Sequence, residues 1–178
     1  MLIVIAGLIG SGKSTIAKQV SERLNIPLYS IDDDKKKIYV QHPQYEYFIK
    51  NHILFPDSVR KQTFDASLKG LRKLAKTHRH AIVEETFHQK SSREPFFNEA
   101  KKLFGGMLLT LVTVNDKLVK ERLDKRAKEE DHMVGHGMYL SLKKKWEPFA
   151  HIDYTFVNEG NLEENLEKYI NFLKKKLN

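Results

Sequence analysis

The most constraining feature of the chain is an apolar run that leads directly into a glycine-rich loop. Residues Leu2–Ala6 are all apolar, which is typical of a strand buried in a parallel sheet. The pattern G-x-x-x-x-G-K-[ST] then follows in full, as Gly7, Leu8, Ile9, Gly10, Ser11, Gly12, Lys13 and Ser14. Such a loop wraps phosphate groups with backbone N–H groups, and the helix behind it adds its positive end. The combination predicts a nucleotide-binding α/β fold.

The last residues of the loop have separate expected roles. Lys13 is expected to reach the β- and γ-phosphates of a nucleotide, and the Ser14 hydroxyl to hold Mg²⁺. Thr15, which follows, belongs to the same nucleotide-binding segment. The glycines are needed where the backbone approaches the phosphates closely or takes a positive φ. We therefore expect ATP and Mg²⁺ as cofactors.

Beyond the loop, apolar strands alternate with amphipathic helices. Further strands are predicted at 28–31, 81–84, 107–114 and 152–157. Helices are predicted at 13–24, 44–54, 57–77, 95–104, 117–128 and 138–147, with a last helix at 162–177. This order predicts a three-layer α/β/α fold with a five-stranded parallel sheet. Ligands of such sheets bind at the carboxyl ends of the strands.

Length and composition limit the remaining possibilities. The 178 residues suit a single domain, and the absence of cysteine excludes disulfides and thiolate metal sites. No stretch approaches the roughly 18 apolar residues of a membrane span, and the run Leu2–Ile9 lacks the basic stretch of a signal peptide. We therefore expect a soluble cytoplasmic protein. The net charge of +8 fits either a polyanionic partner or a solvated lysine-rich surface.

Motifs that are absent narrow the class of phosphate-loop protein. A GTPase needs N-K-x-D and D-x-x-G, and neither is present; residues 115–118 do not fit the first. The D-G-[FY]-P-R motif of adenylate kinases is also missing, which argues against a mononucleotide kinase. A small kinase remains. It needs a carboxylate near the acceptor hydroxyl, a carboxylate that supports Mg²⁺, and arginines that cover the transferred phosphoryl group.

Asp32, Asp33 and Asp34 are candidates for the acceptor carboxylate, because they directly follow the second predicted strand. A hydroxyl is a poor nucleophile, so a carboxylate is needed to orient it and accept its proton. If the segment is extended, Asp32 and Asp34 share one face and Asp33 takes the other. The alternative is that the three residues form an acidic cap on a helix that continues through Lys35.

Glu84 and Glu85 stand at the end of the third predicted strand. A carboxylate at this place commonly holds a Mg²⁺-bound water. Consecutive strand residues point to opposite faces, so we expect only one of the two to face the site. The alternative is a strand end that faces solvent.

Arg122 and Arg126 are candidates for the arginines over the phosphoryl group. They are four residues apart on a predicted helix, which places them on one face, and arginine suits forked contacts with phosphate. The alternative is a pair of surface arginines bridged to neighbouring glutamates.

Together these motifs resemble the small ATP-dependent kinases known as the AAA-domain-33 or zeta-toxin-like group, whose relatives include polynucleotide 5′-hydroxyl kinases, gluconate kinase and chloramphenicol phosphotransferase. The resemblance covers most of the chain. It rests on the phosphate loop and on Ser30, Asp32, Lys35, Lys36, Glu84-Glu85-Thr86-Phe87, Arg93, Arg122-Leu123-Asp124-Lys125-Arg126 and Glu147-Pro148. The chain departs from the group in two places: Glu84 replaces an aspartate, and Lys35 replaces an arginine.

The resemblance implies a nucleotide-kinase-like domain over residues 1–178, with substrate-binding helices at about 35–60 and a helical lid at about 120–146. It implies transfer of the γ-phosphoryl group of ATP to a hydroxyl of a small molecule or of a nucleic-acid 5′ end. In this interpretation Ser14 and Glu84 hold Mg²⁺, and Asp32 orients the acceptor, with Asp34 as the alternative. Asp34, Lys35 and Arg93 bind substrate. A nucleotide-binding switch or RNA-binding module with weak or no transferase activity stays open as the alternative function.

Aromatic residues are frequent in the expected substrate region. Tyr45, Tyr47, Phe48 and Phe55 lie there in sequence. Two interpretations stay open at this point. The rings line a substrate pocket or stack on bases, or they pack in the core.

Overall fold

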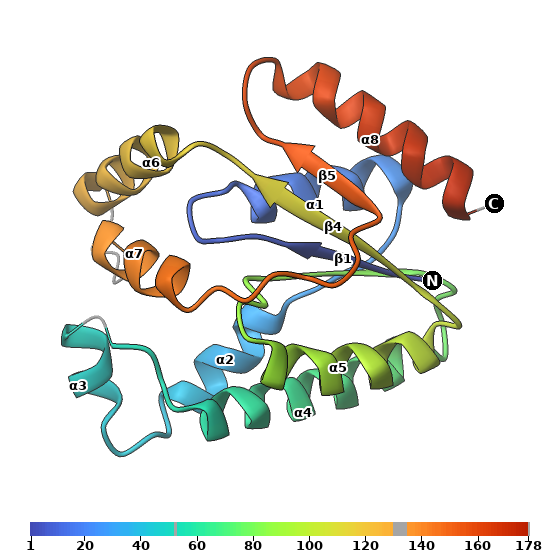
Figure 1. The fold of residues 1–178 in the computed structure, drawn as a ribbon. Helices are drawn as coiled ribbons and strands as arrows, with labels where there is room; N and C mark the ends of the chain where they lie inside the picture. The colour runs from blue at the N-terminus through green and yellow to red at the C-terminus, as the bar shows by residue number, and fades with distance from the viewer. Residues whose placement is uncertain (52, 130–134, 178) are drawn as a thin grey trace.

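The computed structural model describes residues 1–51, 53–129 and 135–177. It has three layers, with a parallel sheet between two layers of helices (Figure 1). The strands are β1 (Leu2–Ala6), β2 (Leu28–Tyr29), β3 (Ala81–Glu85), β4 (Met107–Thr113) and β5 (Tyr154–Val157). Their order across the sheet is β2-β3-β1-β4-β5. The predicted fold class and the five-stranded parallel sheet are confirmed.

The helices in the described residues are α1 (Lys13–Leu24), α2 (Ile31–Tyr39), α3 (Tyr45–Lys50), α4 (Asp57–Leu74), α5 (Lys90–Leu103), α6 (Asp116–Glu129), α7 (His136–Lys144) and α8 (Leu162–Leu177). Helices α1 and α8 cover one face of the sheet, and α4 and α5 cover the other (Figure 1). Helices α6 and α7 stand beyond the carboxyl ends of the strands, where the ligands of such sheets bind. Among the described residues, no helix is both long and apolar enough to cross a lipid bilayer.

Strand β1 is the centre of the fold, and its burial explains its sequence. All five of its side chains are fully buried, because helices cover both faces. It pairs with β3 on one side and β4 on the other, and its last residue, Ala6, lies opposite Glu85 and Leu111. The loop that leaves β1 therefore begins directly beside the two glutamates at the end of β3.

The aspartate segment is helical, so the prediction of an extended segment is wrong. Strand β2 ends at Tyr29, and Ser30 caps α2 by accepting a 3.1 Å hydrogen bond from the backbone N–H of Asp33. Asp32, Asp33 and Asp34 then occupy the first turn of α2, where negative charge is favoured by the helix dipole. The alternative prediction, that the three aspartates form the acidic start of a helix, is confirmed.

Helix α5 begins five residues before Pro95, which was predicted to start it. The first turn is set at Lys90, whose backbone N–H donates to a Glu147 carboxylate oxygen over 2.5 Å. Pro95 therefore lies inside the helix, where its missing N–H leaves one helical hydrogen bond unmade.

The segment predicted to form a lid, at about 120–146, contains most of α6 and all of α7. Asn115 caps α6, since its side-chain oxygen accepts from the backbone N–H of Leu118 over 2.9 Å. Helix α7 starts at His136, earlier than predicted, and ends at Lys144. Tyr139 of α7 donates to Asp116 of α6 over 2.6 Å, which ties the two helices together. Residues 130–134 of the predicted lid lie outside the described residues.

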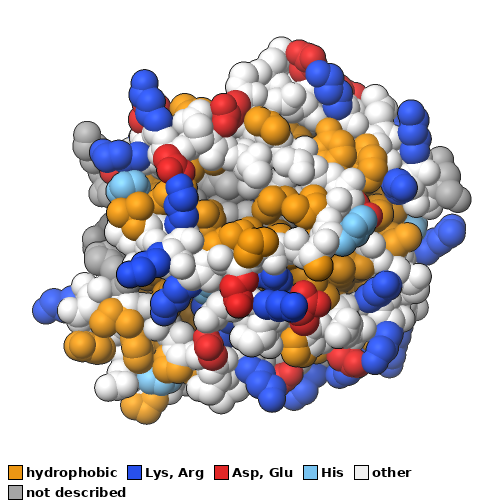
Figure 2. Space-filling view, in the orientation of Figure 1, with side chains coloured by type: hydrophobic (Ala, Val, Ile, Leu, Met, Phe, Trp, Pro, Cys, Tyr) orange, Lys and Arg blue, Asp and Glu red, His pale blue; other side chains and the backbone are white. Residues whose placement is uncertain are grey.

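Basic side chains are distributed over the face of the molecule that Figure 2 shows. Figure 2 shows lysines and arginines spread around this face, with glutamates and aspartates among them. Many of the lysines form ion pairs within their own helix, such as Lys120 with Asp124 and Lys168 with Glu164. This face therefore resembles a solvated surface more than a single polyanion-binding patch.

Candidate active site

The phosphate loop needs glycine at position 12 for two reasons. Gly12 has a φ of 89°, in the left-handed region, and a Cβ there would lie 2.2 Å from the side-chain nitrogen of Asn158. That nitrogen donates to the backbone oxygen of Ser11 over 2.7 Å. Asn158 follows β5, so the last strand of the sheet fixes the path of the loop. Sequence reasoning missed Asn158, although a polar residue at the carboxyl end of a strand is a usable signal.

Leu8 and Ile9 anchor the loop to the lid helices. Both side chains pack against a buried cluster of Val119 and Leu123 from α6 and Tyr139 from α7. These two side chains therefore serve packing, and the loop's expected contact with phosphate rests on its main chain.

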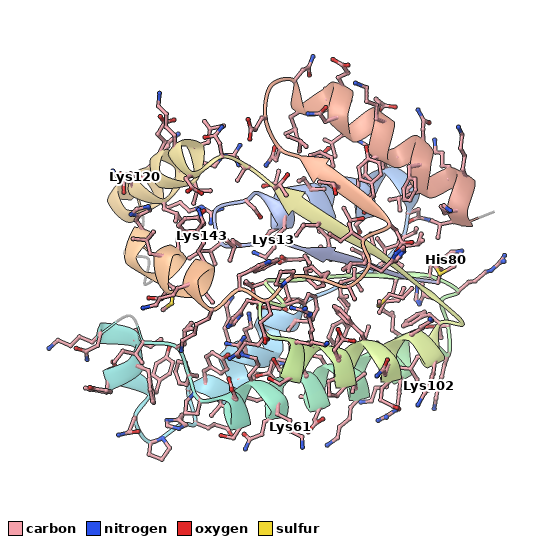
Figure 3. The ribbon with its side chains drawn as sticks, in the orientation of Figure 1. Lys13, Lys61, His80, Lys102, Lys120 and Lys143 are labelled. Carbon is pink, nitrogen blue, oxygen red and sulfur yellow. The ribbon has the colours of Figure 1, made fainter. Side chains whose placement is uncertain are left out.

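Lys13, Ser14 and Glu84 meet at the carboxyl edge of the sheet, where Figure 3 labels Lys13. Ser14 Oγ donates to Glu84 Oε1 over 3.1 Å, and Lys13 Nζ lies 3.7 Å from Glu84 Oε2. Burial raises the pKa of Glu84, and the Lys13 ammonium opposes this shift. The structure thus joins three predicted site residues in one cluster.

The Ser14–Glu84 pair fits a magnesium ion. Mg²⁺ prefers oxygen ligands and keeps several waters, so one hydroxyl and one carboxylate suffice beside the nucleotide phosphates. Glu84 Oε2 is buried and makes no hydrogen bond within the described structure. A buried carboxylate oxygen in this state is suited to accept from a metal-bound water.

Glu85 turns to the other side of β3 and pairs with Lys35. The two side chains form an ion pair, and Lys35 Nζ also donates to Asp32 Oδ1 over 2.9 Å. Burial acts to raise the pKa of Glu85, but the lysine ammonium charges lower it by more and hold it below its ordinary value. The two glutamates therefore serve different partners: Glu84 faces the phosphate loop, and Glu85 connects β3 to Asp32 through Lys35.

The structure does not bring Asp34 into this cluster. Its Oδ2 accepts from the Tyr29 hydroxyl and from Ser67 Oγ, each over 2.8 Å. On a helix, two positions correspond to a rotation of about 200°, so Asp34 faces α4 while Asp32 faces β3. The expectation that Asp32 and Asp34 share a face is therefore wrong, because it required an extended segment.

The structure also keeps Arg93 out of the site. Its side chain is fully buried, and its donors bind the backbone oxygens of Phe87 at 3.0 Å, Glu147 at 2.7 Å and Pro148 at 2.6 Å. Its guanidinium carbon lies 4.2 Å from the centre of the Phe149 ring. Arg93 thus fastens the loop after β3 to the segment after α7. This contact explains why the chain carries both Arg93 and the Glu147-Pro148 pair.

Arg122 and Arg126 border a hollow on the α1 side of the phosphate loop. Arg122 donates to the backbone oxygens of Gly10 at 3.3 Å and Asn158 at 3.3 Å. A cavity of about 360 Å³ lies there, and its lining includes Arg122, Arg126, Gly12, Thr15 and Asn158. The predicted nucleotide-binding residue Thr15 and both predicted arginines therefore meet at one hollow, which we call the α1–α6 hollow.

A second cavity, of about 230 Å³, lies among α2, α3, α4 and α7, next to Glu85 at the end of β3. We call it the α2–α4 cavity. Its charged or polar lining residues are Lys35, Arg60, Thr63, Glu85, Thr86 and His88. Its apolar lining residues are Ile9, Tyr39, Phe48, Ile49, Ile53, Leu54, Phe55, Phe64, Met138 and Leu142. Phe48 and Phe55 pack on each other with ring centres 4.9 Å apart, so here the aromatics both pack together and line a pocket. Tyr47, by contrast, is largely exposed.

Backbone strain at Phe87 places two polar side chains in the α2–α4 cavity. Phe87 has a φ of 52°, which is costly for a bulky residue, and its ring is buried against Phe64 and Phe96. The neighbours on either side, Thr86 and His88, line the cavity. This backbone conformation lets the Phe87 ring pack in the core while Thr86 and His88 line the cavity, and the packing of the ring offsets the strain.

His88 is held neutral at the floor of this cavity. Burial, together with the positive charges of Arg60 and Lys35, lowers the pKa of His88 to about 3. Its ring nitrogen Nδ1 lies 2.8 Å from Arg60 Nη1. Sequence reasoning missed both Arg60 and His88, since neither belongs to a recognisable motif.

Comparisons with known proteins extend over the whole fold. The structure is similar to a sugar kinase from Janibacter sp. HTCC2649, with a TM-score of 0.74, 17% identity, and 97% of this chain and 94% of that one covered. It is similar to a gluconokinase from Sinorhizobium meliloti 1021, with a TM-score of 0.67, 18% identity, and coverage of 98% and 95%. It is also similar to an APS kinase from Mycobacterium tuberculosis in complex with AMPPNP and APS, with a TM-score of 0.63, 16% identity, and coverage of 97% and 96%.

These likenesses are in structure, and identity at this level shows the fold of phosphate-loop kinases. No curated protein sequence matches the chain. The sequence does match a family, described as AAA domain and named AAA_33, over residues 2–143. That match includes the phosphate loop, both glutamates of β3 and the two lid arginines, and the chain belongs to the AAA_33 family.

Proposed function

We propose that the chain is an ATP-dependent kinase that transfers the γ-phosphoryl group of ATP to a hydroxyl of a small molecule. The main observation behind the proposal is that Glu84 and Glu85, although adjacent in β3, face two different sites. Glu84 contacts the phosphate loop, and Glu85 lines the α2–α4 cavity. Two adjacent residues of one strand thus connect a nucleotide side with a separate, partly enclosed second site. A transferase needs both sites, whereas a nucleotide switch needs only the first.

On the nucleotide side, the loop's main chain and the start of α1 bind the phosphates. Lys13 neutralises the charge of the β- and γ-phosphates, and Arg122 and Arg126 reach the nucleotide from the α1–α6 hollow. Ser14 and Glu84 would hold Mg²⁺, which would neutralise negative charge on the transferred phosphoryl group. The APS kinase with bound AMPPNP has the same fold, which supports ATP as the nucleotide.

On the acceptor side, Asp32 orients the hydroxyl and accepts its proton while the hydroxyl oxygen attacks the γ-phosphorus and ADP leaves. Lys35, which lines the α2–α4 cavity, supports Asp32, since it bonds to both Asp32 and Glu85. The transition state is loose, so most of the catalysis comes from positioning and charge neutralisation rather than from a strong base.

Relatives of similar fold include a sugar kinase and a gluconokinase, whose names support a small hydroxyl compound as the acceptor. The scattered distribution of basic side chains in Figure 2 favours a small molecule over a nucleic-acid end. The test below also distinguishes a nucleic-acid acceptor and a nucleotide-binding switch that transfers no phosphoryl group.

The test is a measurement of ATP consumption across a library of hydroxyl compounds and 5′-hydroxyl oligonucleotides, with Lys13→Ala as the control. We expect ADP formation that depends on a small hydroxyl compound. In Lys13→Ala it should fall by about 10²–10³ while the fold is kept. Turnover with oligonucleotides alone would assign a nucleic-acid acceptor. RNA binding that depends on ATP without any phosphorylated product would assign a switch.

A further inference from the structure

The α2–α4 cavity has two unlike sides. One side carries Lys35, Glu85, Arg60 and His88, and the other is built from aromatic and aliphatic side chains. A ligand that fills such a cavity needs a polar end and an apolar body, because a polar group set against the apolar side would lose its hydrogen bonds to water without replacement.

The charges on the polar side do not balance. Two cations, Lys35 and Arg60, and one carboxylate, Glu85, line the cavity, and Glu85 pairs with Lys35. Among the described residues the Arg60 guanidinium hydrogen-bonds only to the His88 ring, and no described carboxylate lies within 4.0 Å of it. Its Nε is buried and has no hydrogen-bond partner in the described part of the chain. The cavity therefore holds one cation whose counter-charge is not supplied by these residues.

The apolar side presents a preformed aromatic surface. Tyr39 and Phe55 are stacked with ring centres 4.1 Å apart, and Phe48 lies 4.9 Å from Phe55. Met138 and Leu142 of α7 complete this side. A flat apolar group gains by packing here, whereas a polyol places its hydroxyls against carbon.

The size of the cavity limits the ligand. An apolar cavity of about 150 Å³ is enough to bind benzene. A cavity of about 230 Å³ therefore accommodates one ring together with a small acid group and a hydroxyl. It does not accommodate several stacked bases.

We propose that the phosphate acceptor is a small hydroxy acid with an apolar, ring-containing body. Its anionic group pairs with Arg60, and its ring lies against Phe48 and Phe55. Its hydroxyl is directed toward Asp32, which bonds to the lining residue Lys35. This inference rests on the proposed kinase function and narrows its substrate class. A cavity for such an acid differs from a cavity for an uncharged sugar, which would need neither a cation nor an aromatic surface.

Calorimetry without nucleotide tests the inference with three probes. These are 3-phenyllactate, its neutral counterpart 3-phenylpropane-1,2-diol, and gluconate, which keeps the acid but lacks the ring. We expect the wild-type protein to bind 3-phenyllactate roughly ten-fold or more tightly than either other probe, since a charged hydrogen bond and a buried ring are each worth about that factor.

Variants assign the preference to its residues. Arg60→Gln should abolish the preference for 3-phenyllactate over the diol, and Phe48→Ala should abolish the preference over gluconate. Arg72→Gln makes the same charge change on an exposed part of α4, and Tyr47→Ala removes an exposed ring of α3. Both controls should keep the wild-type preferences.

Three results would overturn the inference: equal or undetectable binding of 3-phenyllactate and the diol, tighter binding of gluconate, or a charge preference that survives in Arg60→Gln. ADP formation is measured separately with each probe. Phosphorylation of gluconate together with its tighter binding would refute the hydroxy-acid inference and leave the kinase proposal standing. The predicted binding pattern with no transfer to any hydroxyl compound would refute the kinase proposal and leave the cavity's ligand class supported.

Discussion

Ser14 Oγ donates a 3.1 Å hydrogen bond to Glu84 Oε1, although the two residues are 70 positions apart in the chain. Parallel pairing of β1 and β3 produces this contact, because it places the loop after β1 beside the end of β3. The hydroxyl and the carboxylate expected to serve Mg²⁺ are therefore brought together by the fold itself. Glu84 was predicted for this role despite the aspartate usual in the family, and its geometry supports the prediction.

Glu84→Gln is predicted to lower phosphoryl transfer by about 10²–10³ and to raise the Mg²⁺ concentration needed for half-maximal rate. The shape and the Ser14 contact are kept, so the unfolding midpoint in urea should stay near wild type. A Mg²⁺ titration of the rate measures the effect. An unchanged Mg²⁺ requirement would show that Glu84 does not serve the metal.

Glu85→Gln is predicted to act on stability instead. It leaves the Lys35 ammonium without its buried partner, although Asp32 still neutralises part of the charge. We expect a loss of about 2–3 kcal/mol in the free energy of unfolding, somewhat below the usual range for a broken buried pair. Urea unfolding checks this value, and a variant as stable as wild type would contradict the account of the Lys35–Glu85 pair.

Asp32→Asn is predicted to slow acceptor phosphorylation by about 10², the lower part of the range for loss of a general base, because a loose transition state demands little of the base. MgATP affinity should stay near wild type, since Asp32 serves the acceptor. The measurements are calorimetric ATP binding and the rate of transfer, made on the same protein samples.

Asp34→Asn is the matched comparison for this prediction. It weakens the contacts with Tyr29 and Ser67, so we expect about 1 kcal/mol of destabilisation and nearly full transfer. Full transfer by the Asp32 variant with loss in the Asp34 variant would assign the base to Asp34. Full transfer by both would leave the aspartates as a helix start only.

Much of the fold was predictable because its signals are local. The apolar run of β1, the phosphate loop and the cap at Asn115 all depend on residues adjacent in sequence. Helix α2 was given only as an alternative, because the same aspartates suit both a strand end and a helix start. The side-chain cap from Ser30 decides between the two in the structure.

The candidate site was predictable only where a motif marks it. Arg93 was assigned to substrate because its family position suggests it, yet its partners at Glu147 and Pro148 lie 54 and 55 residues away. No periodicity reveals such a contact. Arg60 and His88 were missed for the same reason: each matters only because α4 and the loop after β3 meet at one cavity.

Arg126→Lys is predicted to keep ATP binding but lose most of the transfer rate, because lysine carries the charge without the forked donor geometry. Arg72→Lys, an exposed change on α4, is the control and should behave as wild type. Steady-state rates at saturating MgATP give the comparison. An Arg126→Lys variant as fast as wild type would make this arginine a surface residue without a role in transfer.

His88 predicts a pH dependence of stability. Its native pKa of about 3 lies below the ordinary value of 6.5, so between these values the unfolded chain binds a proton that the native state does not. The stability that depends on neutral His88 is therefore fully present above pH 6.5. It falls as the pH is lowered toward 3, by up to about 1.4 kcal/mol per pH unit.

Urea unfolding at pH 7 and pH 5 tests this prediction in two variants. His88→Gln should lose less stability between the two pH values than wild type does. His78→Gln, which changes an exposed histidine, should keep the wild-type difference. A His88→Gln variant with the full wild-type difference would contradict the buried neutral state of His88.

The central claim is that the γ-phosphoryl group passes directly to an acceptor hydroxyl. The most direct measurement is to run the reaction in water enriched in ¹⁸O and to analyse the products by mass spectrometry. Direct transfer predicts a phosphorylated acceptor without solvent ¹⁸O, formed together with ADP and absent in Lys13→Ala. Inorganic phosphate that carries one solvent ¹⁸O, with no phosphorylated acceptor, would show that the protein hydrolyses ATP and would contradict the account.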